Sequence, residues 1–132
     1  MTEDVDDGSS SSVSIRLPAT ARYLRVARLT ASSLAADLDF DMDQLDEVKV
    51  AVDELGAALL GPAGEGELEL VFDTTDNELS VRGRRRARND LTLDPIAVEL
   101  LEIVTDAYDL RTDDGHHSFW LRKSRPADRD DR

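Results

Sequence analysis

The sequence contains no cysteine, which excludes disulfides and thiolate metal sites. It has no apolar run near the roughly 18 residues that a membrane-spanning helix needs. Residues 1–12 also lack the apolar stretch of a signal peptide. We therefore expect a cytoplasmic protein that does not enter membranes. Aromatic residues make up only 5% of the chain, so the core must be built from Leu, Val, Ile and Ala.

Basic residues are scarce relative to acidic ones, because 16 Lys and Arg stand against 29 Asp and Glu and leave a formal net charge of −13. Such a surface repels phosphate backbones and anionic bilayers, which argues against nucleic-acid and membrane partners. A basic protein partner is the better electrostatic match. The alternative is that the acidic surface serves solubility alone.

The length of 132 residues fits one folded domain. Residues 1–12 are acidic and Ser-rich without apolar periodicity, and residues 124–132 are mostly charged. Segments of this composition cannot bury enough apolar surface to fold, so we expect both ends to be disordered. The folded domain is predicted to span residues 13–123.

The first half of this domain has the pattern of a strand followed by two helices. Apolar and polar residues alternate over 13–17, and the apolar spacing changes to three and four residues over 20–38. A second helical stripe begins after Asp41 or Asp43, either of which can cap a helix, and it ends at Gly61.

The second half has the pattern of two hairpins separated by a helix. Alternation over 68–72 and 79–81 predicts the first hairpin, and 108–111 with 118–123 predicts the second. Between them, Asp94 precedes a proline and marks a helix start. The order β-α-α-β-β-α-β-β predicts an α+β sandwich, with helices on one face of a mixed, mainly antiparallel sheet.

The helix after Asp94 contains apolar residues at a spacing of four, namely Ile96, Leu100 and Val104. Ala97, Leu101 and Ala107 flank them. This arrangement predicts that these residues together form the buried side of the helix.

Motifs of the common phosphate and hydrolase sites are missing from the chain. It has no G-x-x-x-x-G-K-[ST] loop, no G-x-G-x-x-G turn and no G-x-S-x-G elbow. Its two histidines, His116 and His117, are adjacent. Adjacent residues of a strand point to opposite faces, so this pair is badly placed to bind one metal ion. The sequence therefore predicts no metal site.

Asp53 and Glu54 are the most distinctive acidic pair, because they stand beside the apolar stripe of the second helix. Successive helical residues are about 100° apart, so at least one of these carboxylates lies near the apolar boundary. Partial desolvation there raises a carboxyl pKa and suits general-base catalysis. The alternative is a solvated helix edge, with one of the acids paired to a nearby Arg or Lys.

The helix that contains V-A-V-D-E at Val50–Glu54 resembles the N-box helix of the anti-sigma-factor serine kinases, which belong to the histidine-kinase-like (GHKL) ATPase superfamily. The opening segment 17–28 is similar to the first strand and helix of that family, and 118–123 is similar to its last strand. The resemblance covers about residues 13–123. It implies the two-layer α/β sandwich of the histidine-kinase-like (Bergerat) type.

The resemblance implies an ATP-Mg site in which Glu54 matches the acid that assists as general base. The family has a magnesium-coordinating Asn four residues later, where this chain has Ala58. A methyl group cannot coordinate a hard cation. The departure from the family pattern predicts that kinase activity is lost.

A second departure concerns the glycines that let the backbone of family members approach phosphate. Between Gly83 and Gly115 there is no glycine, and the segment begins with a basic run, Arg84–Arg86. If nucleotide is bound at all, these three arginines together with Asp53 and Glu54 are the candidate contact residues. The expectation is that no cofactor is bound.

Two functions from different classes follow from the resemblance. The first is a non-catalytic anti-sigma-like regulator that binds a sigma factor or an anti-anti-sigma protein through protein contact. The alternative is a divergent ATP-dependent serine/threonine protein kinase, with Glu54 as base and Arg84–Arg86 acting on phosphate. A third hypothesis is that the domain has kept the family's fold but binds an unrelated partner. The family also forms dimers, which implies a homodimer here.

Overall fold

The computed structural model describes residues 10–61, 65–87 and 90–125. Regular structure fills most of this range, and a short 3-10 helix, η1, leads into α1. The elements are, in chain order, β1 (Ser11–Pro18), η1 (Ala21–Tyr23), α1 (Leu24–Asp37), α2 (Met42–Leu60), β2 (Glu67–Thr74), β3 (Glu78–Arg86), α3 (Pro95–Val104), β4 (Ala107–Asp113) and β5 (His116–Ser124).

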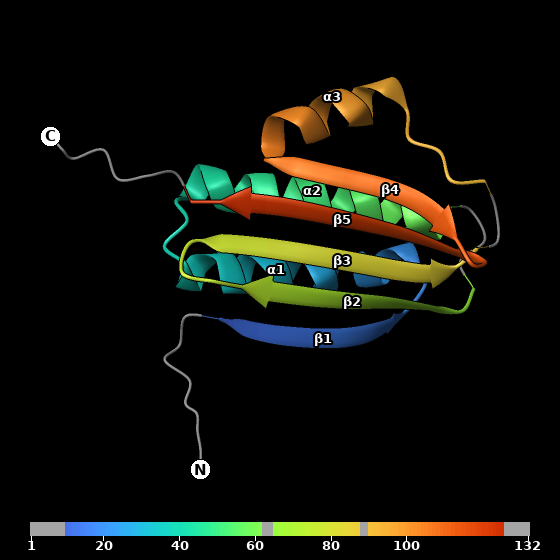
Figure 1. The fold of residues 1–132 in the computed structure, drawn as a ribbon, viewed down its shortest axis with the longest axis horizontal. Helices are drawn as coiled ribbons and strands as arrows, with labels where there is room; N and C mark the ends of the chain where they lie inside the picture. Colours follow the sequence, from blue (N-terminus) through green and yellow to red (C-terminus); the bar gives the residue numbers. More distant parts are fainter. Residues whose placement is uncertain (1–9, 62–64, 88–89, 126–132) are drawn as a thin grey trace, which may run out of the picture.

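The strands form one sheet in the order β1-β2-β3-β5-β4, and every neighbouring pair is antiparallel. Helices α1 and α2 lie across one face of this sheet, while α3 lies beside the β4 edge (Figure 1) and packs on α2. The predicted α+β sandwich with helices on one face is confirmed. The sheet is antiparallel throughout the described strands rather than mixed.

The core lies between the sheet and the two long helices. Inward-facing residues of the central strands alternate with exposed ones, as the period of two requires, and Phe72 and Leu121 are fully buried. From α2, Val48, Val52 and Leu55 close the other side with no exposed surface. The core is aliphatic for the most part, as the small number of aromatic residues predicted.

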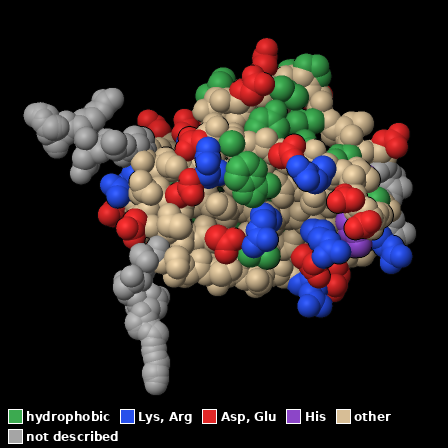
Figure 2. Space-filling model, in the orientation of Figure 1, with side chains coloured by type: hydrophobic (Ala, Val, Ile, Leu, Met, Phe, Trp, Pro, Cys, Tyr) green, Lys and Arg blue, Asp and Glu red, His purple; other side chains and the backbone are tan. Residues whose placement is uncertain are grey.

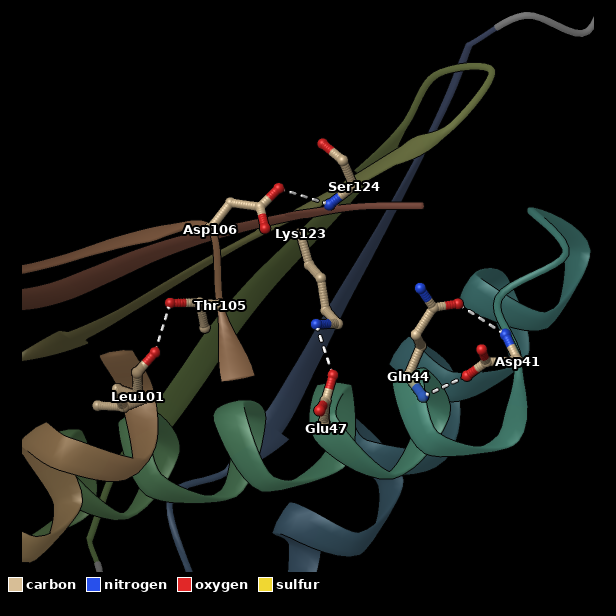
Figure 3. Close-up of polar contacts among 8 residues, drawn as sticks. All are labelled: Asp41, Gln44, Glu47, Leu101, Thr105, Asp106, Lys123 and Ser124. Carbon is tan, nitrogen blue, oxygen red and sulfur yellow. Dashed lines mark hydrogen bonds and ion pairs between the residues drawn. The ribbon is translucent and has the colours of Figure 1, made fainter. Parts of the chain in front are cut away.

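Two acidic caps set the starts of α2 and α3. Asp41 accepts a hydrogen bond from the backbone N–H of Gln44, whose side chain accepts one from the Asp41 N–H (Figure 3). Asp94 accepts from the Ala97 N–H at 2.8 Å and is followed by a proline at the first helical position. Both predicted helix starts are therefore confirmed, with Asp41 rather than Asp43 as the cap.

The ends of the sheet differ from the predicted bounds. Ser11 and Ser12, which we expected in a disordered tail, pair with Thr74 and Asp73 as part of β1. Ser124 likewise belongs to β5. Ser12 and Ser124 lie on the outer face, which tolerates polar residues because it is open to water. The Ser11 hydroxyl lies 2.8 Å from that of Thr74 on the neighbouring strand. The predicted tails otherwise fall on residues 1–9 and 126–132, which lie outside the described residues.

The buried side of α3 was predicted only in part. Ala97, Leu101 and Val104 are buried, but Ile96 is 72% exposed and Leu100 is half-buried. Ala107 lies beyond the helix, because α3 ends at Val104 and β4 begins at Ala107. The helix is apolar on nearly every side, so the spacing of its residues does not determine which side packs on α2. Packing on α2 therefore buries a different side of the helix from the one that the spacing predicted.

Gly83 allows the ring of Phe119 to pack against the backbone of β3. A Cβ at this position would lie 2.3 Å from the Phe119 Cε2 atom. We expect Gly83→Ala to lower the free energy of unfolding by about 1 to 3 kcal/mol, because the buried ring must shift. Urea unfolding monitored by circular dichroism would measure this.

Gly56→Ala is the matched comparison, because its Cβ would meet only the flexible end of Leu24, at 2.7 Å from Cδ2. A gain in helix propensity of about 1 kcal/mol offsets that contact. Equal losses of stability in the two variants would contradict this account of Gly83.

Candidate functional site

The two acids predicted on α2 have different surroundings. Arg28 of α1 donates from Nη1 to the Asp53 Oδ1 atom at 2.7 Å, and both side chains are partly exposed. Asp53 thus takes the predicted alternative of an ion pair with a nearby arginine. Partly exposed pairs of this kind stabilise a fold by about 1 kcal/mol at most. Its visible role is to tie α1 to α2.

Glu54 is half-buried on α2, as its place beside the apolar stripe predicted. Within the described residues it forms no ion pair and no side-chain hydrogen bond. One helical turn later, Ala58 is half-buried and has no side-chain atom that could coordinate a cation. Of the two acids predicted on α2, Glu54 is therefore the one without a polar partner among the described residues.

A further ion pair, which sequence reasoning missed, joins α2 to the sheet. The Lys123 ammonium donates to the Glu47 Oε1 atom at 2.8 Å (Figure 3). The Lys123 side chain is only 9% exposed, whereas that of Glu47 is 36% exposed. The residues are 76 positions apart in the chain, so no local pattern could indicate the contact.

The basic run Arg84–Arg86 belongs to β3, which extends further than the predicted strand 79–81. It pairs with His116, His117 and Ser118 of β5. Because side chains alternate along a strand, Arg85 faces the helices while Arg84 and Arg86 are exposed on the opposite face. The three arginines therefore do not form one cluster.

Arg85 is buried and bonded to backbone carbonyl groups near the end of α2. Its Nη1 donates to the carbonyls of Leu59 and Leu60, and its Nη2 donates to the carbonyl of Glu65. A cation is favoured there, because the last carbonyls of a helix lack partners within the helix and carry partial negative charge. Arg85 caps α2 from a neighbouring strand.

The outer face of the sheet, which α1 and α2 leave uncovered, carries interspersed acidic and basic side chains (Figure 2). Arg82 donates to Asp73 at 3.0 Å, and Arg111 donates to Asp109 at 2.8 Å. The hydrogen bond and the charge of Asp109 raise the pKa of the Arg111 guanidinium above its ordinary value. Charges on this face thus largely compensate one another.

A cavity on this face has a volume of about 440 Å³ and includes Trp120, Val71 and Arg84 in its walls. A second cavity of about 380 Å³ lies where Arg84 and Arg86 meet the start of β2. Neither cavity is lined by Asp53 or Glu54. The fold therefore separates the acidic candidates on α2 from the two exposed arginines.

The two histidines lie on opposite faces of β5, as their adjacency predicted. His117 is buried, with Nδ1 at 2.9 Å from the Thr112 hydroxyl, and His116 contacts Arg84 on the outer face. Among the residues that the structure describes, no three His, Asp or Glu side chains form a group suited to a metal ion. None of the described helices combines the length and apolarity needed to cross a bilayer.

Comparisons with known proteins agree with this fold. No protein-family model matches the chain. The chain is 28% identical over 72 residues to the serine-protein kinase RsbW of Bacillus anthracis, and 26% identical to that of Bacillus mycoides (strain KBAB4). Each match covers 52% of this chain and 45% of the relative, so the chain spans about half the length of the curated relatives it matches.

A solved structure extends the likeness in fold. The crystal structure of the RsbU and RsbW domains of Rv1364c from Mycobacterium tuberculosis matches with a TM-score of 0.69 and covers 89% of this chain and 34% of that one. Its sequence identity of 18% bears on the fold alone. Taken together, the comparisons show that the chain is similar in sequence to RsbW serine-protein kinases over about half its length and is similar in fold to a protein with an RsbW domain.

Proposed function

We propose that this protein regulates transcription by binding a sigma factor or an anti-anti-sigma protein, without phosphorylating it. The observation that carries the proposal is Ala58, one turn after Glu54 on the half-buried side of α2. The family resemblance assigns that position to the magnesium ligand. An alanine there removes the oxygen that a hard cation requires.

The surroundings of the other candidate residues support the same proposal. Asp53 is held by Arg28, and Arg85 is held by the carbonyls that follow α2. Arg84 and Arg86 face away from the helices. The residues present thus do not fit magnesium-ATP as a set, because no two of them are free and close together on the helical side.

The charge of the chain supports a protein partner. A sigma factor binds DNA through basic surfaces, and a protein with a net charge of −13 complements such surfaces. A competing anti-anti-sigma protein would then control the interaction by occupying the same regulator. The homodimer implied by the family remains a prediction, which sedimentation equilibrium would test.

A nucleotide titration tests the loss of catalysis. We expect no saturable binding of a fluorescent ATP analogue at millimolar concentration, with or without magnesium, because the metal ligand is missing. Magnesium-dependent binding that disappears in Glu54→Gln would contradict the proposal. It would favour a divergent serine/threonine kinase. Glu54 is compatible with that alternative, because it has no polar partner among the described residues.

The choice of partner needs a separate measurement. Purified sigma factors and anti-anti-sigma proteins of the native organism would be tested for binding by calorimetry. Binding to one of them supports the proposal. If none of these proteins bound and a pull-down recovered an unrelated protein, the chain would have this fold but a different function.

A further inference from the structure

Helix α3 exposes two large apolar side chains on one side. Ile96 and Ile103 are each 72% exposed, and a separation of seven residues places them two turns apart on the same face. Half-buried Leu100 lies between them. Single exposed apolar residues are ordinary, but three in one stripe form a contiguous surface. Figure 2 shows apolar side chains gathered at the top of the molecule, where Figure 1 places α3.

The surroundings of this stripe are acidic and contain no basic residue nearby in the chain. Residues 90–107 contain five Asp and Glu and no Lys or Arg. Glu99 and Glu102 are exposed on α3, and within the described residues neither forms an ion pair or a side-chain hydrogen bond. We call Ile96, Glu99, Leu100, Glu102 and Ile103 the α3 patch.

The α3 patch differs in this respect from the outer face of the sheet. There, Asp73 and Asp109 each have an arginine partner within 3.0 Å. The two acids of the patch lack such a partner among the described residues, so the patch itself carries negative charge. A ligand of the patch should therefore supply positive charge as well as apolar surface.

The patch is held on a well-anchored helix. Ala97, Leu101 and Val104 are buried beneath it, and Asp94 caps its start. At its end, the Thr105 hydroxyl donates to the Leu101 carbonyl at 2.7 Å (Figure 3). A preformed surface of this kind binds without a large ordering cost.

We propose that the α3 patch binds a basic amphipathic helix of a protein partner. Apolar side chains of that helix would cover Ile96, Leu100 and Ile103, and its Lys or Arg side chains would face Glu99 and Glu102. The assignment rests on the proposed function and deepens it by naming a contact surface. A second copy is a poor occupant, because two α3 patches facing each other would bring like charges together.

Two synthetic peptides would test the proposal. One has leucines at positions i, i+3, i+4 and i+7 with lysine elsewhere on the polar face, and the other replaces each lysine with glutamate. We expect the lysine peptide to bind the full chain and to shift the amide NMR signals of α3, with affinity falling as salt rises. The glutamate peptide should not bind.

Variants test whether the lysine peptide binds the α3 patch or the acidic surface in general. Ile96→Gln with Ile103→Gln should weaken binding of the lysine peptide about tenfold or more, which corresponds to about 1.4 kcal/mol. Leu29→Gln with Met42→Gln is the matched control, because these side chains are 59% and 73% exposed on α1 and α2. Equal weakening by both pairs, or no shift of α3 signals, would overturn the proposal.

The same variants distinguish this proposal from the proposed function. If a sigma factor or an anti-anti-sigma protein binds the wild-type chain, the α3 pair should weaken that binding and the control pair should not. Undiminished binding by the α3 pair would overturn the patch while leaving the proposed function in place. If the chain formed a dimer that Ile96→Gln with Ile103→Gln dissociated and the control pair did not, the α3 patch would bind a second copy of the chain. That result would overturn the proposal that it binds a basic helix.

Discussion

Replacing Arg85 with alanine is expected to lower the free energy of unfolding by about 2 to 4 kcal/mol, because three backbone carbonyls lose a buried donor. Arg85 is 3% exposed and bonds to the carbonyls of Leu59, Leu60 and Glu65. The substitution also removes the cation from the negative end of α2. Urea unfolding followed by circular dichroism would measure the loss.

Arg86→Ala is the control for this prediction, because Arg86 is the next residue of β3 and is exposed on the outer face. A substitution at such a surface position typically changes stability by no more than about 0.5 kcal/mol. Hydrogen exchange adds a local measurement, since Arg85→Ala should speed exchange in the last turn of α2. If the two variants lost equal stability, Arg85 would not be the cap that its contacts indicate.

Replacing Glu47 with alanine is expected to lower the free energy of unfolding by about 2 to 3 kcal/mol. This loss is somewhat less than the loss expected for a fully buried ion pair. The substitution leaves the Lys123 ammonium, whose side chain is 9% exposed, without its carboxylate at 2.8 Å. Lys123→Met should cost less than about 1 kcal/mol, because a similar apolar chain replaces the buried cation. The asymmetry follows from burial: Glu47→Ala leaves a buried ammonium unpaired, whereas Lys123→Met leaves the Glu47 carboxylate, which is 36% exposed and can be hydrated.

The double variant Glu47→Ala with Lys123→Met completes the cycle. It should be more stable than Glu47→Ala alone, since the buried charge is gone. Thermal or urea unfolding of all four proteins would give the coupling free energy. A double variant whose losses simply add would indicate that the ammonium reaches water in Glu47→Ala and that the pair does not hold α2 to β5.

Local signals in the sequence were sufficient to predict the helices and strands. Asp41 and Asp94 carry side-chain oxygens that satisfy free N–H groups at a helix start, so their positions predicted the starts of α2 and α3. Alternation of apolar residues predicted the strands, and the order of elements predicted the α+β class. Resemblance at Val50–Glu54 predicted the family, which the RsbW matches support.

The candidate site was less predictable. Asp53 and Glu54 are adjacent and look equivalent in sequence, yet Arg28, 25 residues away, pairs with only one of them. The arginine run lies beyond the predicted strand 79–81, and its three side chains were candidate contacts for one nucleotide. The pairing of β3 with β5 extended the strand through it and divided its side chains between two faces.

The sequence by itself determined where helices and strands form, because caps, turns and apolar periods act over a few residues. Only the tertiary structure decided which side of α3 is buried, where Arg85 points and how β1 and the two predicted hairpins join into one sheet. Those outcomes depend on contacts between residues far apart in the chain, and several arrangements have the same local pattern. For α3, packing on α2 buried Leu101 and left Ile96 and Ile103 exposed, which produced the surface proposed to bind a partner.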